Sequence, residues 1–381
     1  MKLVVTGGGS GGHLSPALAV ISKLKEKFAQ KNSKLDILFI GGTLGMEGTK
    51  GPSAEQIVLP KTDIPHVFIC AGKLQRSVSL TSPILLLGII PGFLQSLYHL
   101  LKFKPDLIFS TGGFVSVPVV LAGWFLRIPT VLHEQTAAVG LANKIGGLFA
   151  KIVAISFLSS EKEFSKKKVV LTGNPIRPAI LAVRGVRFLR LQKETIEEYP
   201  LLYITGGSFG SHIINEVVGK ILPHLLEKYL VVHQCGDNDV YQDYVKLLEL
   251  KERLPKDMQS RYSLLKYLDE RQLAEVFGKT LFAISRAGAN TVNELMALGI
   301  PAILVPIPWV TNNEQYKNAR VLANLDLGSI VAENELTPEG LLQEIETFEK
   351  RQEEFKSRSL AVLSKEWPDA AEKLAEIITN V

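Results

Sequence analysis

Three copies of the tripeptide Thr-Gly-Gly stand where this 381-residue chain could bind phosphate groups. Each copy directly follows a short apolar run, in KLVVTGGGSGGH (2–13), DLIFSTGGF (106–114) and LLYITGGSFG (201–210). Glycine lets a backbone N–H come close to an anion, and the positive end of a following helix adds to the attraction. The spacing therefore predicts three phosphate-binding loops.

The elements that must position these loops follow from the hydrophobic pattern. Short β-branched runs alternate with longer amphipathic segments, which is typical of βα units around a parallel sheet. Each half of the chain has its own glycine-rich opening loop, so we expect an α/β protein of two doubly wound domains. Strands are expected in LVVTG, DILFIG, HVFICAG, LIFSTG, TVLHE and IVAIS, and then in LLYITG, LVVHQCG, YSLLKYL, LFAISRAG, AILVP and GSIVAE.

The join between the two domains is expected near KVVLTGNPIRP (168–178), where two prolines interrupt the pattern. Domain 1 is expected to span residues 1–171, and domain 2 residues 172–361. The charged sequence that follows predicts a last helix at about 362–381, which packs back on domain 1.

Composition and charge are those of a globular protein. The 46% hydrophobic and 21% charged residues exclude a disordered or fibrous chain. Cys70 and Cys235 are the only cysteines, and a first strand at Lys2 leaves no room for a signal peptide, so we expect a cytoplasmic location. The net charge of +5 is spread along the chain rather than gathered in a stripe, so no nucleic-acid partner is expected.

The first loop also matches the dinucleotide-binding pattern G-x-G-x-x-G, through Gly7, Gly9 and Gly12. That pattern needs an acidic residue at the end of the second strand, where it holds a ribose hydroxyl. Asp36 opens the second strand instead of closing it, which argues against a dehydrogenase. The loop remains suited to a diphosphate.

Six motifs follow one another in order along nearly the whole chain, from Lys2 to about Glu333. They are GGSGGH (8–13) with Pro16 soon after, HEQ (133–135), GNPIR (173–177), GGSFG (206–210), SRAGANTVNE (285–294) and EQYKNA (314–319). Together they resemble the MurG family, part of glycosyltransferase family 28, whose members make lipid II in bacterial peptidoglycan synthesis.

The resemblance implies a GT-B fold, in which two Rossmann-like domains are separated by a deep cleft. It implies inverting transfer of N-acetylglucosamine from UDP-N-acetylglucosamine (UDP-GlcNAc) to the 4-hydroxyl of undecaprenyl-diphospho-N-acetylmuramoyl-pentapeptide (lipid I), giving lipid II and UDP. The alternatives are a related glycolipid synthase acting on diacylglycerol and a non-catalytic nucleotide-sugar-binding module. A diacylglycerol has no diphosphate for the first loop, which argues against the synthase.

By the same resemblance, UDP-GlcNAc lies mainly on domain 2. Arg177 and Ser208 are expected at its diphosphate, and the backbone of Leu268 at the uracil edge. Glu294 is expected at the ribose hydroxyls, and Gln315 at the sugar, because a neutral amide both donates and accepts. The full donor set is Ser10, Gly11, Gly12, Thr136, Arg177, Ser208, Leu268, Ala289, Asn290, Thr291, Val292, Asn293, Glu294 and Gln315.

Several of these residues also have a purely structural interpretation. Ser208 and Asn290 could be N-caps of helices, Glu294 a solvated surface acid, and Arg177 a contact within the linker. The family commonly has Asn where this chain has Thr136. A short hydroxyl cannot make both hydrogen bonds of an amide, so that contact with the sugar stays open.

His13 has the chemistry of a general base. Its imidazole can accept the proton of the acceptor's 4-hydroxyl, although it could instead only bind phosphate or cap the helix. Glu134, beside His133, is a second catalytic candidate, or both residues are hydrogen-bonded structural groups at the strand end. The acceptor diphosphate is assigned to Gly9, His13, Gly112 and Gly113.

No metal site is predicted, because the seven histidines are scattered and no cysteine cluster accompanies them. A divalent cation could accompany the substrate diphosphates with few protein ligands. Cofactor dependence is therefore left open.

The segment SPILLLGIIPGFLQSLYHLLKFK (82–104) is almost long enough to span a bilayer, but a proline and polar residues interrupt it. It fits a buried helix or a helix with one apolar face on a membrane. Lys73, Arg76, Lys102 and Lys104 favour the membrane. With the resemblance, this predicts peripheral association with the anionic cytoplasmic face of the bacterial inner membrane, where lipid I and other cell-wall synthesis proteins are the expected partners.

Overall fold

The chain folds into two compact units. Unit 1 comprises Met1–Ile176 and Pro368–Val381, and unit 2 comprises Arg177–Trp367. The structure therefore changes unit after Ile176, where the sequence predicted a boundary after residue 171, and residues 362–367 belong to unit 2 rather than to a final helix on unit 1. The computed structural model describes residues 1–8, 11–43, 53–71, 89–193, 198–207, 209–238, 240–310 and 313–381.

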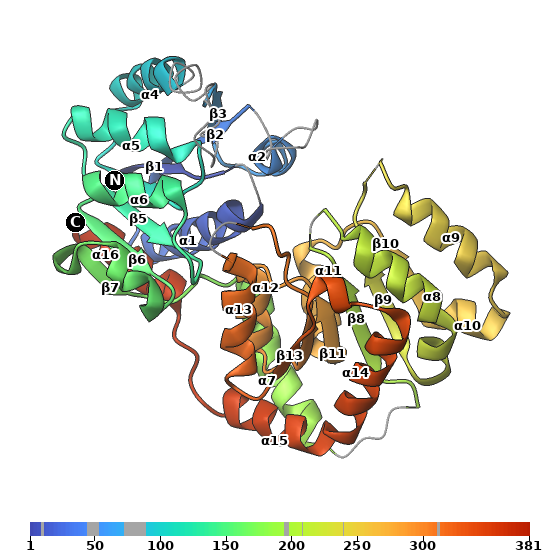
Figure 1. The fold of residues 1–381 in the computed structure, drawn as a ribbon. Helices are drawn as coiled ribbons and strands as arrows, with labels where there is room; N and C mark the ends of the chain where they lie inside the picture. Colours follow the sequence, from blue (N-terminus) through green and yellow to red (C-terminus); the bar gives the residue numbers. More distant parts are fainter. Residues whose placement is uncertain are drawn as a thin grey trace. The chain divides into compact units, whose positions relative to one another are not determined.

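Unit 1 is built on a parallel sheet with the strand order β3-β2-β1-β4-β5-β6-β7 (Figure 1). The first six strands in the chain are the ones predicted. The seventh strand, β7, was not predicted and lies in the stretch that the sequence analysis treated as the join. Its residues are half exposed at the sheet edge and lack the hydrophobic pattern of a buried strand. The strands are β1 (Lys2–Thr6), β2 (Asp36–Gly42), β3 (His66–Ile69), β4 (Leu107–Ser110), β5 (Thr130–Glu134), β6 (Ile152–Ile155) and β7 (Val169–Leu171).

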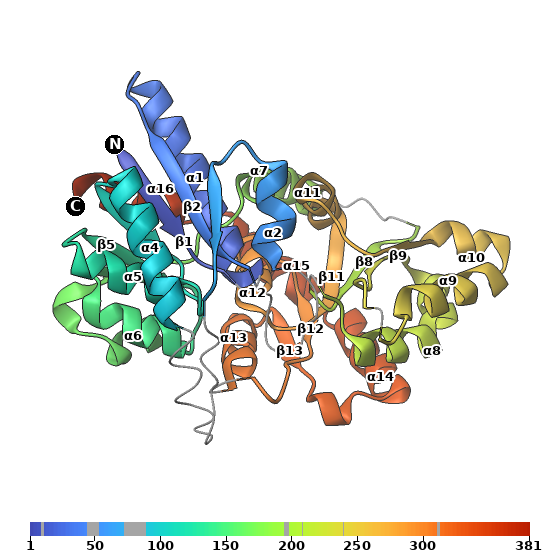
Figure 2. The same ribbon diagram turned by 90° about the horizontal axis from the view of Figure 1, so that it is seen from above.

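Helices cover both faces of this sheet. Leu3 and Val5 of β1 share a buried cluster with α1 and α16, whereas Val4 faces the other side and packs with α4 and α5. Figures 1 and 2 show α16 beside α1, and Lys23 of α1 lies 3.4 Å from Glu372 of α16. The helices are α1 (Gly11–Gln30), α2 (Ala54–Val58), α4 (Ile89–Phe103), α5 (Ser116–Phe125), α6 (Leu141–Phe149) and α16 (Ala370–Asn380), with 3-10 turns η1 (Leu59–Lys61), η2 (Leu158–Glu163) and η3 (Lys166–Lys168).

Unit 2 is built on a second parallel sheet, of order β10-β9-β8-β11-β12-β13. All six strands were predicted: β8 (Leu201–Thr205), β9 (Leu230–Gln234), β10 (Tyr262–Leu265), β11 (Thr280–Ser285), β12 (Ala302–Leu304) and β13 (Gly328–Ile330). The helices are α7 (Pro178–Gln192), α8 (His212–Lys228), α9 (Asp243–Arg253), α10 (Lys256–Arg261), α11 (Glu270–Lys279), α12 (Ala289–Ala297), α13 (Glu314–Ala323), α14 (Pro338–Lys350) and α15 (Gln352–Leu363), with the turn η5 (Glu333–Glu335).

The strand order of each sheet reverses direction beside its first strand, between β1 and β4 in unit 1 and between β8 and β11 in unit 2. Doubly wound sheets bind ligands outside the carboxyl ends of their strands at this switch point. The Thr-Gly-Gly loops follow β1, β4 and β8. The fold therefore brings two loops to the switch point of unit 1 and one to that of unit 2.

The apolar segment 82–104 is described from residue 89 onward and forms α4. Gly92, Ser96 and Leu100 are buried against the unit, whereas Leu94 and Tyr98 are more than half exposed. One face is therefore buried, as the first interpretation expects, and contact of the exposed face with a membrane stays a prediction. Across the described ranges, every helix is too short or too polar to cross a bilayer.

Candidate active site

The two glycine loops of unit 1 pack directly against each other. The Gly8 N–H donates to the Gly112 carbonyl at 3.2 Å. Gly113 has a φ of +83°, and a Cβ atom there would lie 2.1 Å from the Gly8 carbonyl oxygen. These contacts leave no room for a side chain, so the glycines at the switch point are required by packing. Gly9 and Ser10, predicted at the acceptor and donor, lie outside the described residues.

His13 lies in the first turn of α1, after Gly11 and Gly12, and faces the second loop. Its Nδ1 is 2.8 Å from the Thr111 carbonyl oxygen, and the Thr111 hydroxyl donates to the His13 carbonyl at 2.8 Å. When Nδ1–H donates to that carbonyl, the lone pair of the neutral ring lies on Nε2. The Thr111 contact thus favours the tautomer that a general base needs.

Gln135 is a site residue that the sequence analysis did not single out. Its side-chain amide lies 2.5 Å from Nδ1 of His13, and its side chain is 2% exposed. The only signal in the sequence was its place in the HEQ motif. Gln135 and Thr111 contact the same ring atom, and because an amide NH₂ can only donate, the Gln135 contact favours a lone pair on Nδ1 whereas the Thr111 carbonyl favours Nδ1–H.

The Glu134 carboxylate is enclosed by hydrogen bonds. Its Oε1 accepts from the Thr136 N–H and hydroxyl, at 2.9 and 2.7 Å, and its Oε2 accepts from Asn143 at 2.9 Å and from the Gly140 N–H at 3.3 Å. Burial raises the pKa of Glu134, and the bonds from Thr136 and Asn143 oppose that shift. These contacts close the loop after β5. A catalytic role for Glu134 stays a prediction.

His133 is likewise a buried group, and its ring has partners separate from those of the Glu134 carboxylate. Its Nε2 lies 3.1 Å from the Gly173 carbonyl and 3.2 Å from the Ser156 hydroxyl. Burial lowers the pKa of His133 to about 4, so the ring is neutral near pH 7. These contacts agree with the alternative interpretation of His133 as a hydrogen-bonded structural group at the strand end.

Thr136, predicted at the donor sugar, is 9% exposed and uses its hydroxyl within the loop. The hydroxyl lies 2.7 Å from Glu134 Oε1 and 2.6 Å from the Ala138 carbonyl. One hydroxyl hydrogen cannot serve both acceptors and also donate to a sugar. A sugar contact of this side chain therefore stays a prediction that competes with these bonds.

The glycine loop of unit 2 packs against the end of β9. A Cβ atom at Gly210 would lie 1.8 Å from the Cys235 carbonyl oxygen, whereas at Gly207, with a φ of +84°, it would meet nothing within 4 Å. Ser208 lies outside the described residues. α8 has its N-cap at Ser211 and α12 at Gly288. The interpretation of Asn290 as an N-cap is therefore wrong, because Gly288 is the N-cap and Asn290 already lies in the helix.

Arg177 and Glu294, predicted at the diphosphate and the ribose, contact each other. Nε and Nη2 of Arg177 donate to Oε1 of Glu294 at 3.0 and 2.8 Å. Glu294 is 4% exposed, so it is not the solvated surface acid of the alternative interpretation. Burial raises the pKa of Glu294, and Arg177 opposes that shift.

Gln315 lies in the first turn of α13 and uses its side-chain oxygen within unit 2. Oε1 accepts from the Ala287 N–H at 3.2 Å and from the Ile307 N–H at 3.1 Å. The side chain therefore ties the loops after β11 and β12 together and retains its NH₂ group as donor. Leu268 lies in the loop between β10 and α11 with its side chain buried, and contact of its backbone with the uracil edge stays a prediction.

The other predicted donor residues of unit 2 lie in the first half of α12. Val292 is fully buried and Asn293 donates to the Ala289 carbonyl at 2.8 Å, so both side chains serve the helix itself. What α12 offers an anion is its N-terminal backbone. These residues are Ala289, Asn290, Thr291, Val292 and Asn293.

Arg286 is a second residue that the sequence analysis missed, although it stands in the SRAG motif directly after β11. Its guanidinium is 7% exposed, donates to the Val305 carbonyl at 3.1 Å and pairs with Glu333. Burial lowers the pKa of Arg286 and Glu333 opposes that shift. A second cation thus lies at the switch point of unit 2.

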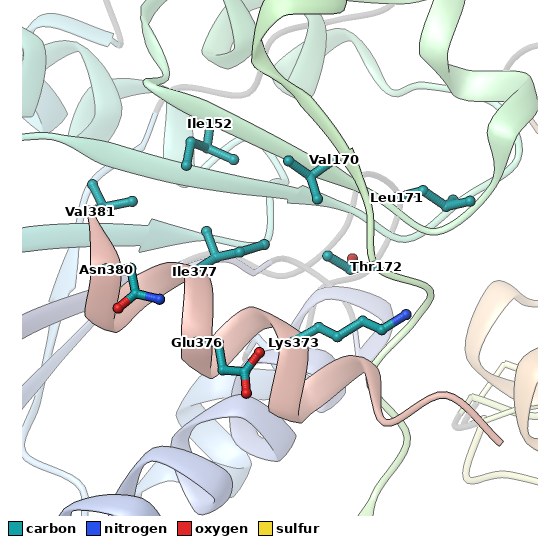
Figure 3. A pocket seen from close by; sticks show the side chains of 9 residues that line it. All are labelled: Ile152, Val170, Leu171, Thr172, Lys373, Glu376, Ile377, Asn380 and Val381. Atoms are coloured by element: carbon teal, nitrogen blue, oxygen red, sulfur yellow. The ribbon is translucent and has the colours of Figure 1, made fainter. Parts of the chain in front are cut away.

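The pocket drawn in Figure 3 shares no residue with these loops. Its volume is about 380 Å³, and β6 and β7 line it opposite α16. Throughout the part of the chain that the structure describes, three His, Cys, Asp or Glu side chains nowhere gather in a way that could hold a metal ion.

Two doubly wound parallel sheets, each with glycine loops at its switch point, define an α/β protein of the GT-B class. The chain belongs to glycosyltransferase family 28: residues 3–155 match the model of the family's N-terminal domain, and residues 201–374 match that of its C-terminal domain.

Similar proteins extend over the whole chain. A relative from Bacillus cereus, named UDP-N-acetylglucosamine–N-acetylmuramyl-(pentapeptide) pyrophosphoryl-undecaprenol N-acetylglucosamine transferase 2, is 35% identical over 363 residues, which cover 93% of this chain and 94% of the relative. A transferase of the same name, without the number, from Natranaerobius thermophilus is 34% identical over the full length of both chains. The crystal structure of Acinetobacter baumannii MurG shares the fold, with a TM-score of 0.71, 23% identity, and coverage of 100% of this chain and 99% of that one.

Proposed function

We propose that this chain is an inverting glycosyltransferase that moves N-acetylglucosamine from UDP-GlcNAc to the 4-hydroxyl of lipid I, which forms lipid II and UDP for peptidoglycan. The observation that carries the proposal is the full-length similarity to transferases whose names state this reaction. The three glycine loops at the switch points supply anion sites for the two diphosphates that the reaction involves.

In the proposed reaction, unit 1 binds the acceptor diphosphate with Gly112, Gly113 and the start of α1. Nε2 of His13 takes the proton of the acceptor's 4-hydroxyl, whose oxygen attacks the anomeric carbon of the donor sugar. The bond between that carbon and the UDP oxygen breaks, and UDP leaves with the bonding electrons. Thr111 supports this role, because its carbonyl can accept only from Nδ1–H, the tautomer whose lone pair lies on Nε2.

Unit 2 binds UDP-GlcNAc in this proposal. The N-terminus of α12 and Arg177 stabilise the charge that develops on the leaving diphosphate. Glu294 accepts hydrogen bonds from the ribose hydroxyls, and the NH₂ group of Gln315 donates to the sugar. Arg177 then serves two anions, the diphosphate and Glu294, which suits a guanidinium with five N–H groups.

The deciding experiment measures UDP release with a short-chain lipid I analogue. UDP-GlcNAc should be active, and UDP-glucose and UDP-N-acetylgalactosamine much less so. A diacylglycerol acceptor tests the glycolipid synthase, and UDP binding without release on any acceptor would indicate the non-catalytic module. Repeating the assay with EDTA and then with added Mg²⁺ tests whether a divalent cation accompanies the diphosphates. Absence of activity with UDP-GlcNAc and lipid I analogue would overturn the proposal.

We also propose that unit 1 associates peripherally with an anionic membrane, where lipid I is found. Exposed apolar side chains occur on the adjacent helices α4, α5 and α6, and ring contacts join these helices: Phe93 with Phe125, and Trp124 with Phe149. Lys102 lies on the same helix as Tyr98 and over its ring. The exposed apolar face comprises Ile90, Leu94, Tyr98, Leu101, Trp124, Phe125 and Leu148.

Flotation with anionic vesicles at low salt tests the membrane proposal. The protein should float with the vesicles, and the double variant Leu94→Gln/Phe125→Gln should stay behind, since it interrupts the apolar face on two helices. Leu248→Gln on α9 of unit 2, which is 37% exposed, is the matched control. Equal flotation of the double variant and the control would contradict the use of this face.

A further inference from the structure

Helix α7 carries three arginines at every third position, and each one bonds to the C-terminal end of a neighbouring helix. Arg190 donates to carbonyls at the end of α11, and Arg184 to carbonyls at the ends of α12 and α15. Arg187 lies between them and joins α11 to α12. Its partners are the carbonyls of Leu298 at 2.8 Å, Thr280 at 2.5 Å, Gly299 at 3.4 Å and Phe277 at 3.5 Å.

This arrangement has a clear physical basis. The last four carbonyls of a helix lack an N–H partner within the helix, and that end carries partial negative charge. A guanidinium offers five N–H donors and no acceptor, so it can satisfy several of these carbonyls at once. Arg187 is 1% exposed, and none of the ion pairs between described residues includes it. Its charge is therefore balanced by helix ends rather than by an acid.

The charge of Arg187 is retained near neutral pH. Burial, with a smaller contribution from Arg190, lowers the pKa of Arg187 to about 9. The side chain therefore reaches the carbonyls as a cation, and hydrogen bonds from a cation are stronger than those of a neutral donor.

Because of these contacts, α7 and the residue before it hold α12 at two places. Arg177, directly before α7, bonds to Glu294 in the middle of α12, and Arg187 bonds to Leu298, the C-cap of α12. α12 has nine residues and is therefore about 13 Å long. A shift of its C-terminal end moves Glu294 and the N-terminus that faces the ligand by a similar amount.

We propose that Arg187 is a positioning residue for the UDP-GlcNAc site, which fixes α12 against α7 so that Glu294 and the N-terminus of α12 are in place before the ligand binds. This inference rests on the proposed function, because it takes the first half of α12 to contact the donor. Loosening the Arg187 contacts should then weaken the binding of UDP, although Arg187 lies at the opposite end of the helix.

The test is calorimetric titration of the full chain with UDP. Arg187→Met should bind UDP about tenfold more weakly, the factor that corresponds to one charge-assisted hydrogen bond, and Arg187→Lys should lie between it and the unchanged chain. Arg190→Lys, which loosens only α11, should stay within about twofold. The KM for the lipid I analogue should not change in any of these variants.

A second measurement separates positioning from loss of fold. In Arg187→Ala the missing group leaves a space for a guanidinium ion, so millimolar guanidinium chloride should restore part of the UDP affinity. It should not do so in Arg190→Ala. If Arg187→Met fails to fold, Arg187→Lys carries the test, with its fold checked by thermal denaturation.

Three results would count against the proposal. Folded Arg187→Lys and Arg187→Met that bind UDP as tightly as the unchanged chain would overturn it, and so would an equal loss in Arg190→Lys. Failure of the unchanged chain to bind UDP would instead overturn the proposed function, and this inference with it.

Discussion

The switch point of unit 1 presents glycine loops and an imidazole, whereas the switch point of unit 2 adds two arginines to the same kind of loop. In unit 1, the loops after β1 and β4 pack on each other, and His13 contacts a carbonyl and an amide. In unit 2, the loop after β8 packs against the end of β9, Arg177 is paired with the buried Glu294, and Arg286 is paired with the partly buried Glu333. Both sheets have the same doubly wound topology, but among the described residues only the switch point of unit 2 carries arginine side chains.

This difference matches the two halves of a glycosyl transfer. A departing diphosphate gains negative charge in the transition state, which fixed cations nearby stabilise. A general base must instead be neutral before it accepts a proton, and a carbonyl that holds Nδ1–H allows this. The comparison therefore supports the proposal that UDP departs from unit 2 and that unit 1 removes the proton.

The largest expected effect comes from removing the imidazole of unit 1. His13→Ala should lower kcat by about 10²–10⁴-fold, the usual contribution of a general base, and leave the UDP affinity unchanged. UDP release gives kcat and calorimetry gives the affinity. His66→Ala on β3, whose ring contacts the Ile64 carbonyl, is the control. Near-normal turnover of His13→Ala would exclude the base role.

The next largest effect is on the pH dependence of stability, through one buried histidine in each unit. Burial lowers the pKa of His133 to about 4 and that of His233 to about 3. In the unfolded chain both histidines bind a proton below about pH 6.5, whereas in the folded chain they stay neutral until a lower pH. The free energy of unfolding therefore falls as the pH drops from about 6.5 towards 4. For His133 the loss is about 3 kcal/mol.

His133→Gln should remove this pH dependence from the free energy of unfolding of unit 1. The pH dependence of unit 2 should stay the same. Trp124 is the only tryptophan of unit 1, so its fluorescence in a Trp309→Phe/Trp367→Phe background reports on that unit during denaturation at several pH values. The same background with His133 intact is the reference. If the stability of unit 1 depends on pH equally in His133→Gln and in the reference, His133 is not the source of the pH dependence.

A smaller effect tests the packing of the loops. Gly113 and Gly207 have almost the same φ, +83° and +84°, but only at Gly113 would a Cβ atom meet another loop. Gly207→Ala should cost about 1–2 kcal/mol of stability through its backbone alone. Gly113→Ala should cost at least about 1 kcal/mol more. Urea denaturation measures the loss of stability in each variant. Equal losses in Gly113→Ala and Gly207→Ala would show that the packed loops of unit 1 accommodate a Cβ atom as readily as the open loop of unit 2.

The smallest effect concerns Thr136. Thr136→Val removes a hydroxyl that bonds within the loop, so stability should fall by about 1 kcal/mol. Since the hydroxyl is already engaged, the KM for UDP-GlcNAc should stay within about twofold. A larger rise in KM with little loss of stability would instead place the hydroxyl at the sugar.

Features that depend on local sequence could be predicted. Every predicted strand is present, because short β-branched runs between glycines carry a strong signal, and all three Thr-Gly-Gly loops follow strands at a switch point. β7 was missed because its residues are half exposed. The alternative interpretation of Asn290 as an N-cap was wrong, because Asn is a good N-cap residue but Gly288 caps α12 without a side chain.

Long-range partners could not be predicted. The carbonyl that orients His13 belongs to Thr111, 98 residues away, and the bond between Arg177 and Glu294 joins residues 117 apart. The arginines of α7 look like a solvated helix face, because the sequence does not show that three helices end beside them. Motifs could therefore identify the residues of the site, but not which of them already bind each other.

The return of α16 to unit 1 sets the order in which the chain can be completed during synthesis. Leu374, Ala375 and Ile378 belong to the same buried cluster as Leu3 and Val5 of β1. The ribosome therefore makes β1 long before α16, and the core around β1 is whole only after α16 has emerged. Unit 2 has all of its residues earlier, so the unit that begins first is finished last, and its open core needs protection meanwhile.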